Sequence, residues 1–140
     1  MSRVFIDTNV LVYCVDGRSP AKRTRARKLL RAVRRDSSGV ISTQVLQEFY
    51  VAATRKLGVD PRIAHRIVGL LRNLEVVTVT PFLIDRAIGL SVLNQLSFWD
   101  ALIVVSAEEA GCEEVCSEDF QAGGVVRGVR IANPFEVEHS

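Results

Sequence analysis

The side chains with the clearest chemical potential in this 140-residue sequence are carboxylates: Asp7, Glu48, Asp100, Glu118 and Asp119. Each follows a short apolar run that predicts a strand, or begins the helix behind one. In an open parallel sheet, the carboxyl ends of the strands meet at one edge, where ligands bind. We therefore expect these carboxylates to lie near one another at that edge.

Carboxylates that are brought together repel, and each raises the pKa of its neighbours unless a cation compensates. Oxygen ligands without Cys or His favour Mg²⁺ or Mn²⁺ over Zn²⁺. Such a cation can polarise a phosphodiester and lower the pKa of an attacking water. This chemistry requires no Ser–His nucleophile, and none is evident in the sequence.

Each acid also has a simpler explanation. Asp7 opens Asp-Thr-Asn, a good turn sequence, and Glu48 could be an ordinary charge at the edge of an apolar helix face. Asp100 stands three residues after Ser97, as in a capping box. The acids at 118 and 119 could merely solubilise a loop. Spacing alone does not decide between a metal site and these simpler roles. Chance is nevertheless a weaker explanation for so many acids at one predicted edge of the sheet.

The elements that must position these acids alternate between strand and helix patterns. We predict strands at 3–6, 39–42, 75–80, 114–117 and 129–132, and helices at 10–15, 43–57 and 98–110 and from residues 20, 61 and 81 onward. This alternation predicts an α/β fold, a parallel sheet with helices on both faces. The length fits one domain, residues 1–140, with the last few residues frayed.

Charge is distributed unevenly, although the formal net charge is only +2. Sixteen of the 18 Lys and Arg lie before Asp100, while nine of the 16 Asp and Glu lie from Asp100 onward. Nine bases lie between Arg18 and Arg35, and Arg23, Arg27, Arg31 and Arg34 form a helical stripe. The stripe suits a polyanion, and a solvated basic helix face explains it equally well. A membrane-surface helix is the weaker alternative, because the apolar face lacks Trp and Phe.

Cysteine and histidine give no metal motif. Cys14, Cys112 and Cys116 lack zinc-site spacing, so we interpret them as buried structural thiols in a reducing cytoplasm. His65 falls in a helix and His139 in the tail, and neither receives a role. No apolar stretch approaches the ~20 residues that span a bilayer, so we expect no membrane association.

Four segments of the sequence resemble, in order, the motifs of PIN-domain nucleases. They are Val4–Tyr13, Ile41–Tyr50, Leu96–Ile103 and Cys116–Phe120. The resemblance covers roughly residues 3–135, and the compact size is most similar to toxins of the VapC type. It implies a three-layer α/β/α sandwich with a central parallel sheet of four to five strands. It further implies an endoribonuclease dependent on Mg²⁺ or Mn²⁺.

The resemblance also implies site residues. Asp7, Glu48, Asp100 and Asp119 would be both the catalytic acids and the metal ligands. Polar neighbours would orient ligands or phosphate: Thr8, Asn9, Ser42, Ser117 and Glu118. Within the last motif, an acid two residues after Ser selects Asp119, but the adjacent Glu118 leaves the direct ligand open.

The implied partners are an RNA, with tRNA and rRNA loops as reasonable substrates, a cognate antitoxin protein and a second copy of the chain. The arginine stripe could contact either RNA or antitoxin. One alternative is a PIN-like scaffold that binds RNA or protein without cutting. A receiver-like signalling module fits less well, because only Asp7 lies early and Lys56 is the last lysine. No Gly-rich fingerprint follows the first strand, which argues against dinucleotide or P-loop enzymes.

Overall fold

The computed structural model describes residues 2–120 and 124–136. A six-stranded sheet runs through the middle in the order β3-β2-β1-β4-β6-β5. The strands are β1 (Val4–Ile6), β2 (Gly39–Ser42), β3 (Glu75–Val77), β4 (Glu114–Cys116), β5 (Val125–Val126) and β6 (Val129–Ala132). All neighbouring strands are parallel except β5, which pairs antiparallel with β6.

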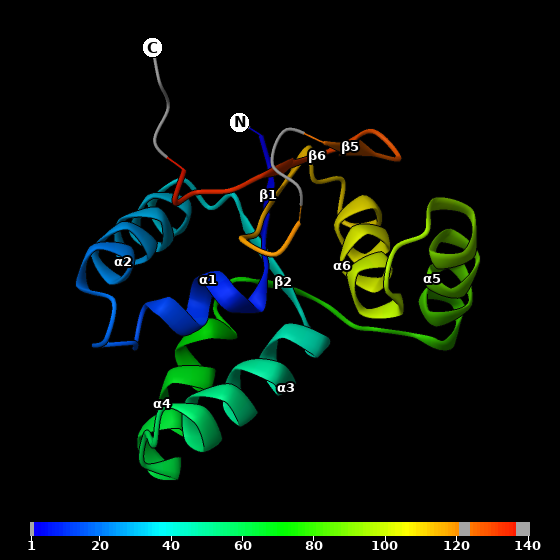
Figure 1. Ribbon diagram of the computed structural model, residues 1–140. Helices are drawn as coiled ribbons and strands as arrows, with labels where there is room; N and C mark the ends of the chain where they lie inside the picture. Colours follow the sequence, from blue (N-terminus) through cyan, green and yellow to red (C-terminus); the bar gives the residue numbers. More distant parts are fainter. Residues whose placement is uncertain (1, 121–123, 137–140) are drawn as a thin grey trace.

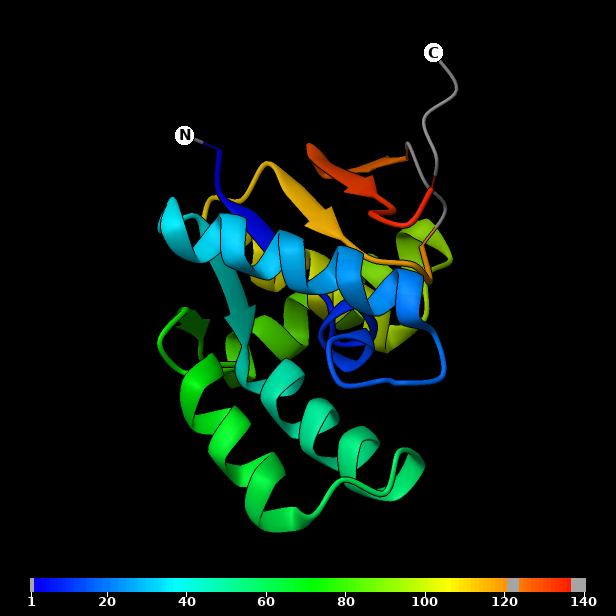
Figure 2. The same cartoon turned by 90° about the vertical axis from the view of Figure 1, so that its left-hand side faces the viewer.

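Helices cover both faces of the sheet, which confirms the α/β fold (Figure 1). They are α1 (Thr8–Tyr13), α2 (Pro20–Arg35), α3 (Thr43–Val51), α4 (Pro61–Leu71), α5 (Pro81–Asn94) and α6 (Phe98–Glu109). Helices α1 and α2 lie on one face and α6 on the other, with α5 packed outside α6 (Figures 1 and 2). Helices α3 and α4 form a pair that extends beyond the carboxyl end of β2 (Figure 2).

The sheet differs from the sequence prediction at two strands. Strand β3 ends at Val77, three residues before the predicted end, and Val79 N instead bonds to the hydroxyl of Thr43 at 3.1 Å. The sixth strand, β5, has only two residues, and a tight turn at Arg127 and Gly128 joins it to β6. Two residues are too few to show an alternating apolar pattern.

The predicted helix at 43–57 also proves to be two elements. Helix α3 ends at Val51 and continues as a π-helical turn, η1 (Ala52–Lys56), in which Leu57 N bonds to Ala52 O at 3.3 Å. Such widened turns are rare and often lie at functional sites. The turn follows directly from the helix that carries Glu48.

Short polar side chains begin most of the helices. Thr80 and Ser97 accept hydrogen bonds from Leu83 N and Asp100 N at 3.3 and 3.1 Å, and Asp60 caps α4 from in front of a proline. These caps satisfy amide groups that the first helical turn leaves without partners. The helix starts predicted from Ser97 and Asp60 are therefore confirmed.

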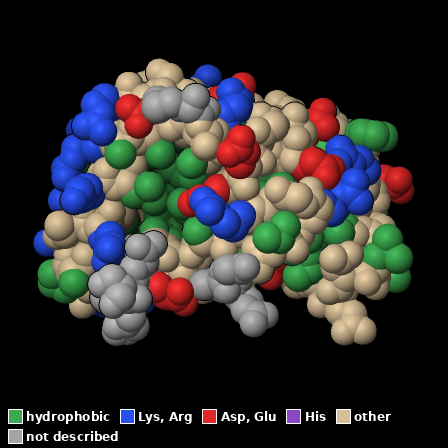
Figure 3. Space-filling view, turned by 90° about the horizontal axis from the view of Figure 1, so that it is seen from above, with side chains coloured by type: hydrophobic (Ala, Val, Ile, Leu, Met, Phe, Trp, Pro, Cys, Tyr) green, Lys and Arg blue, Asp and Glu red, His purple; other side chains and the backbone are tan. Residues whose placement is uncertain are grey.

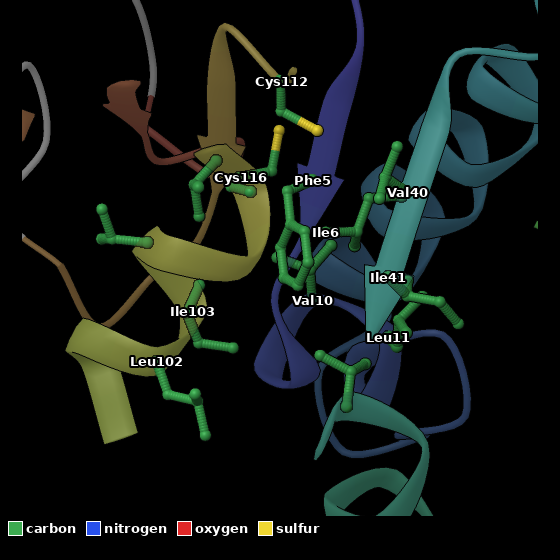
Figure 4. Close-up of a cluster of buried hydrophobic side chains, with 14 of the residues drawn as sticks. Phe5, Ile6, Val10, Leu11, Val40, Ile41, Leu102, Ile103, Cys112 and Cys116 are labelled. Carbon is green, nitrogen blue, oxygen red and sulfur yellow. The ribbon is translucent and has the colours of Figure 1, made fainter. Parts of the chain in front are cut away.

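The core lies between the sheet and the helices on its two faces. Phe5 and Ile6 of β1 are fully buried, and they meet Ile103 of α6 on one side and Val10 of α1 on the other (Figure 4). Gly39 permits a close approach at the start of β2, because a Cβ there would lie 2.9 Å from Val33. This packing fixes β1 at the centre of the sheet, where its carboxyl end carries Asp7.

Cys112 and Cys116 are buried, the first just before β4 and the second at its last position, and Cys14 is half-buried. Burial raises the pKa of the first two thiols to about 11 and about 12. All three cysteines are free. Their predicted role as structural thiols is borne out by these positions.

Across the described residues, no single helix is long and apolar enough to cross a membrane; α5 and α6 reach that length and composition only as a pair bent by 118°. The predicted fraying of the last few residues concerns 137–140, which lie outside the described residues.

Candidate active site

The strand order places a switch point between β1 and β4. From β1 the chain proceeds outward through β2 and β3, and β4 returns to the other side of β1 and continues to β6. Ligand sites of open α/β sheets lie outside the carboxyl ends of the strands at such a point. Asp7 follows β1 and Ser117 follows β4, so both stand at this position.

Asp7 is the most buried of the four predicted acids, with 7% of its surface exposed. Its carboxylate accepts hydrogen bonds from Thr8 N and from the hydroxyl of Ser117, both at 2.7 Å. Burial raises its pKa to about 6 against the lowering effect of these two bonds, and the charges of Glu48 and Asp119 raise it further. A carboxyl group with this pKa exchanges its proton near neutral pH.

Asn9 connects the two strand ends through its side-chain amide. Its Nδ2 donates to Asp119 Oδ2 at 2.9 Å and to Ser117 Oγ at 3.1 Å, while its Oδ1 accepts from Glu118 N at 3.1 Å. A longer contact of 3.4 Å reaches Asp7 Oδ2. Asn9 therefore fixes the position of Asp119 relative to Asp7.

Glu48 and Asp100 approach the same edge from α3 and α6. Partial burial raises the pKa of Glu48, and the charges of Asp100 and Asp119 add to this effect. The pKa of Asp100 is likewise raised by partial burial and by the charge of Asp119, against a bond with Ser97. These mutual charge effects show that the four predicted acids lie within electrostatic range of one another at the carboxyl edge of the sheet.

Thr8 and Ser42 act at this edge in different ways. The backbone of Thr8 bonds to Asp7, while its buried hydroxyl faces Glu48 and acts to lower the pKa of that carboxyl group. Ser42 is fully buried, and its hydroxyl accepts a bond from Val45 N at 3.3 Å. That bond caps α3, so Ser42 helps to place the helix that carries Glu48.

The adjacent acids Glu118 and Asp119 differ sharply in their surroundings. Glu118 accepts hydrogen bonds from Lys22 at 2.5 Å and Tyr13 at 2.7 Å. Burial works to raise the pKa of Glu118, but these two donors outweigh it and lower the pKa overall. Asp119 instead faces Asn9 and the other acids. The geometry thus favours Asp119 as the fourth member of the cluster, with Glu118 occupied by a cation of the protein itself.

The donor set suits a hard divalent cation. Asp7, Glu48, Asp100 and Asp119 offer only oxygen, and Mg²⁺ and Mn²⁺ favour such ligands. The raised pKa values of Asp7, Glu48 and Asp100, with no Lys or Arg paired to them among the described residues, are those of carboxylates that a cation would stabilise in the charged form. Within residues 2–120 and 124–136, no three acidic, His or Cys side chains already stand in metal-ligating positions. The residues fit the cation in the type of ligand that they offer.

A groove of about 740 Å³ extends from this cluster between α1 and α3. Part of the groove lining comes from residues of the site described above, namely Glu48, Asp119, Thr8 and Asn9. The remaining lining is Val12, Tyr13, Asp16, Arg18, Gln47, Val51, Ala52, Arg55, Lys56 and Glu118. The predicted stripe of Arg23, Arg27, Arg31 and Arg34 is not part of this lining.

The arginine stripe lies on α2 instead. Arg27, Arg31 and Arg34 are exposed and Arg23 is half-exposed. Seen from above, basic side chains crowd the edge of the molecule where α2 lies (Figure 3). The stripe is thus a surface of its own, separate from the acids.

The sequence interpretation missed the bases that do line the groove, Arg55 and Lys56. They follow Glu48 by seven and eight residues, which is two helical turns. That spacing would have placed them on the same helix face as Glu48. Lys22, which holds Glu118, gave no such signal, because its contact spans 96 residues.

The family model described as PIN domain matches residues 4–123. Among curated proteins, none matches. A toxin–antitoxin complex from Klebsiella pneumoniae contains a chain of similar structure, with a TM-score of 0.73 and 21% identity over 97% of this chain and 100% of that chain.

VapC20 of Mycobacterium tuberculosis, described as a sarcin–ricin loop cleaving toxin, is also similar. Its TM-score is 0.66, with 20% identity over 83% of this chain and 89% of that chain. At these identities the two solved structures establish the fold.

Proposed function

The chain belongs to the PIN domain family, and on that premise we propose that it is a metal-dependent endoribonuclease that acts as the toxin of a toxin–antitoxin pair. The observation that carries this proposal is the cluster of Asp7, Glu48, Asp100 and Asp119 at the carboxyl edge, with raised pKa values at the first three. The similar solved structures, a toxin–antitoxin complex and a loop-cleaving toxin, support the biological role.

We assign Mg²⁺ or Mn²⁺ to these four carboxylates. Bound there, the cation would offset the charge of the scissile phosphate and lower the pKa of an attacking water. Cation binding requires deprotonated ligands, so Asp7 would have to be deprotonated to hold the cation. The raised pKa of Asp7 therefore ties metal affinity to pH near 6.

The other residues of the site hold the acids in place. Ser117 and the Thr8 amide orient the Asp7 carboxylate, and Asn9 orients Asp119. Such outer partners commonly change metal affinity or activity by about 10–100-fold when they are removed. We assign Asn9 and Ser117 this positioning role.

An RNA cleavage assay tests the proposal. Purified protein is incubated with a mixed RNA pool in the presence of Mg²⁺ or Mn²⁺, with EDTA and Asp7→Asn as controls. Cleavage by the wild type alone, abolished by EDTA, supports the proposal. Equal cleavage by wild type and variant would reveal a contaminating nuclease. Failure of both with every metal would favour the non-catalytic scaffold.

The chemistry of the products tests the mechanism separately. Water attack at phosphorus leaves a 5′-phosphate and a 3′-hydroxyl, because the RNA 2′-hydroxyl takes no part. End-labelling of the products distinguishes these ends from a 2′,3′-cyclic phosphate. The cyclic product would contradict the hydrolytic mechanism while leaving RNA cleavage itself intact.

A single-stranded loop of tRNA or rRNA is the substrate class we propose, since unstacked bases there are open to recognition.

We propose the α2 stripe as a contact surface for an acidic segment of the antitoxin. Arg27, Arg31 and Arg34 are exposed, and the stripe lies outside the groove lining. Electrostatic complementarity of this kind mainly raises association rates and is screened by salt. Arg31→Glu should slow association with the cognate antitoxin severalfold, measured by surface plasmon resonance, and an unchanged rate would remove the stripe from that interface.

We also propose that the chain forms a homodimer. Helix α5 exposes Phe82, Ile88, Val92 and Leu93, the last with 80% of its surface accessible. Apolar groups gathered on one face commonly mark an interface. Leu93→Glu should convert dimer to monomer in light scattering, and an unchanged mass would exclude this face.

We place the protein in the cytoplasm, because free cysteines suit a reducing compartment.

A further inference from the structure

The wall of the groove formed by α3 and η1 combines both signs of charge in one helical stripe. Glu48, Val51, Ala52, Arg55 and Lys56 all line the groove, at spacings of three, four, seven and eight residues from Glu48. Residues at these spacings share one helix face. The wall therefore passes from a carboxylate, over an apolar stretch, to two cations.

The cations of the groove are not equivalent. Arg18 is held by Asp16 through bonds of 3.0 and 3.1 Å, and this ion pair offsets its charge. Arg55 and Lys56 are exposed and form no ion pair within the described part of the chain. They are thus the groove's free positive charges among the residues described.

Seven residues of helix correspond to about 10 Å along the axis. A phosphate that reaches Arg55 or Lys56 is therefore a different phosphate from the one at the carboxylates. Proteins that bind single-stranded nucleic acid commonly use such a basic groove that follows the backbone. Between these two positions the groove is lined by the apolar side chains of Val51 and Ala52.

We propose that Arg55 and Lys56 bind the backbone of a single RNA strand on one side of the scissile bond. The inference rests on the proposed function, because it takes RNA as the substrate of the groove. The strand enters unpaired, as in other basic grooves that follow the backbone of single-stranded nucleic acid. The π-helical turn is the element that presents both cations beside the acids.

Binding of a labelled RNA tests the inference without cleavage. The probe is a random-sequence single strand of about a dozen nucleotides, and fluorescence anisotropy is followed against salt in an Asp7→Asn background with Mg²⁺. The variant is Arg55→Gln with Lys56→Gln. The matched control is Arg66→Gln with Arg72→Gln, which removes two exposed bases of the α4 region that line no part of the groove.

The groove variant should bind about tenfold more weakly. The slope of log affinity against log salt should fall by about 1.4, since each phosphate contact on a single strand contributes about 0.7. The α4 control should stay within about twofold of its parent, and both variants should melt like the parent. Equal losses in the two variants would overturn the inference, because binding would then follow total charge.

Two further binding measurements show where on the protein the RNA strand lies. Arg31→Gln with Arg34→Gln should leave the affinity for the single strand within about twofold; a larger loss there than in the groove variant would place RNA on α2 and overturn the inference. The same RNA annealed to its complement should bind equally to parent and groove variant. A matching tenfold loss with the duplex would contradict the single-strand assignment.

Cleavage kinetics separate this inference from the proposed function. In the protein with Asp7 intact, the groove variant should raise KM about tenfold and leave kcat nearly unchanged, as expected when binding outside the reacting centre is lost. If the wild type cleaves RNA and the groove variant has the same KM, the inference fails and the function stands. If the wild type cleaves nothing but the groove variant loses affinity and salt slope, the endoribonuclease assignment fails and the groove remains an RNA site.

Discussion

The two edges of the sheet both carry carboxylates, but in opposite surroundings. At the amino edge, Glu75 pairs with Arg3, Glu114 with Arg130, and Glu108 with Arg86 and Arg127. Figure 3 looks onto this end and shows acidic and basic side chains beside one another. At the carboxyl edge, Asp7, Glu48, Asp100 and Asp119 form no ion pair within the described residues.

The difference shows that the acidic last third of the sequence serves two purposes. Acids paired with arginine are neutralised by the fold itself, whereas the unpaired ones retain a demand for a cation. Glu118 illustrates the contrast within one loop, since Lys22 satisfies it while its neighbour Asp119 stays with the cluster. Pairing, and not the number of acids, distinguishes the candidate catalytic centre.

The largest expected effect comes from removing one acid at each edge. Asp7→Asn should lower RNA cleavage by at least about 100-fold, since loss of a direct ligand exceeds the about 10–100-fold cost of losing an outer partner. Glu114→Gln removes an acid that Arg130 already neutralises and should change cleavage by less than about twofold. Initial rates on one RNA measure both. Equal losses would erase the distinction between the two edges.

The adjacent acids after β4 give the next largest contrast. Asp119→Asn removes a proposed direct ligand and should reduce cleavage by about 100-fold, while Glu118→Gln should reduce it only a few-fold, because Glu118 is occupied by Lys22 and Tyr13. The comparison is made at saturating and at limiting Mn²⁺. A larger loss for Glu118→Gln would exchange the roles assigned to the two side chains.

Stability against pH sharpens the contrast in metal-free protein. The folded-state pKa of Asp7 is raised from 3.8 to about 6, so the folded state binds this proton more tightly than the unfolded state. Its contribution is fully present below about pH 4 and is lost as pH rises through about 6. Relative to Asp7→Asn, the wild type should lose about 2 kcal/mol of unfolding free energy from pH 4 to 7.5. Urea unfolding in EDTA measures this free energy for both proteins at each pH. If the wild type and Asp7→Asn show the same dependence on pH, the raised pKa of Asp7 is contradicted.

The smallest expected effect concerns the paired edge. Arg86→Met removes the cation between Glu108 and Glu109, while Arg127 still pairs with Glu108. Partly exposed pairs of this kind contribute about 1 kcal/mol or less. Urea unfolding should report that loss, with RNA cleavage unchanged. A drop in cleavage without a drop in stability would tie this edge to catalysis after all.

The sequence indicated the edge at which the four acids lie, because Asp7 and Asp119 follow strands and Asp100 follows a recognisable helix cap, while Glu48 lies in the second turn of the helix behind β2. Asp100 after Ser97 is the clearest case, and the structure shows that cap. The capping and catalytic explanations of Asp100 are thus compatible: its amide bonds to Ser97 while its carboxylate joins the cluster.

Other features depend on contacts that no local pattern contains. Lys22 and Glu118 are 96 residues apart, so their pairing follows from how the elements pack. Strand β5 is stabilised by its partner β6 and not by its own two residues. The arginine stripe on α2 is a strong sequence signal, yet the fold points it away from the groove, and the less conspicuous Arg55 and Lys56 line it instead.

Titration of Mn²⁺ into the protein without RNA tests the central claim most directly. The claim is that the unpaired carboxylates of the carboxyl edge form a divalent-cation centre, and electron paramagnetic resonance counts free Mn²⁺ as it is added. Wild type and Glu114→Gln should bind Mn²⁺ alike, with affinity that rises through pH 6, and Asp7→Asn should bind at least about 100-fold more weakly. Equal binding by Asp7→Asn and wild type would contradict the account.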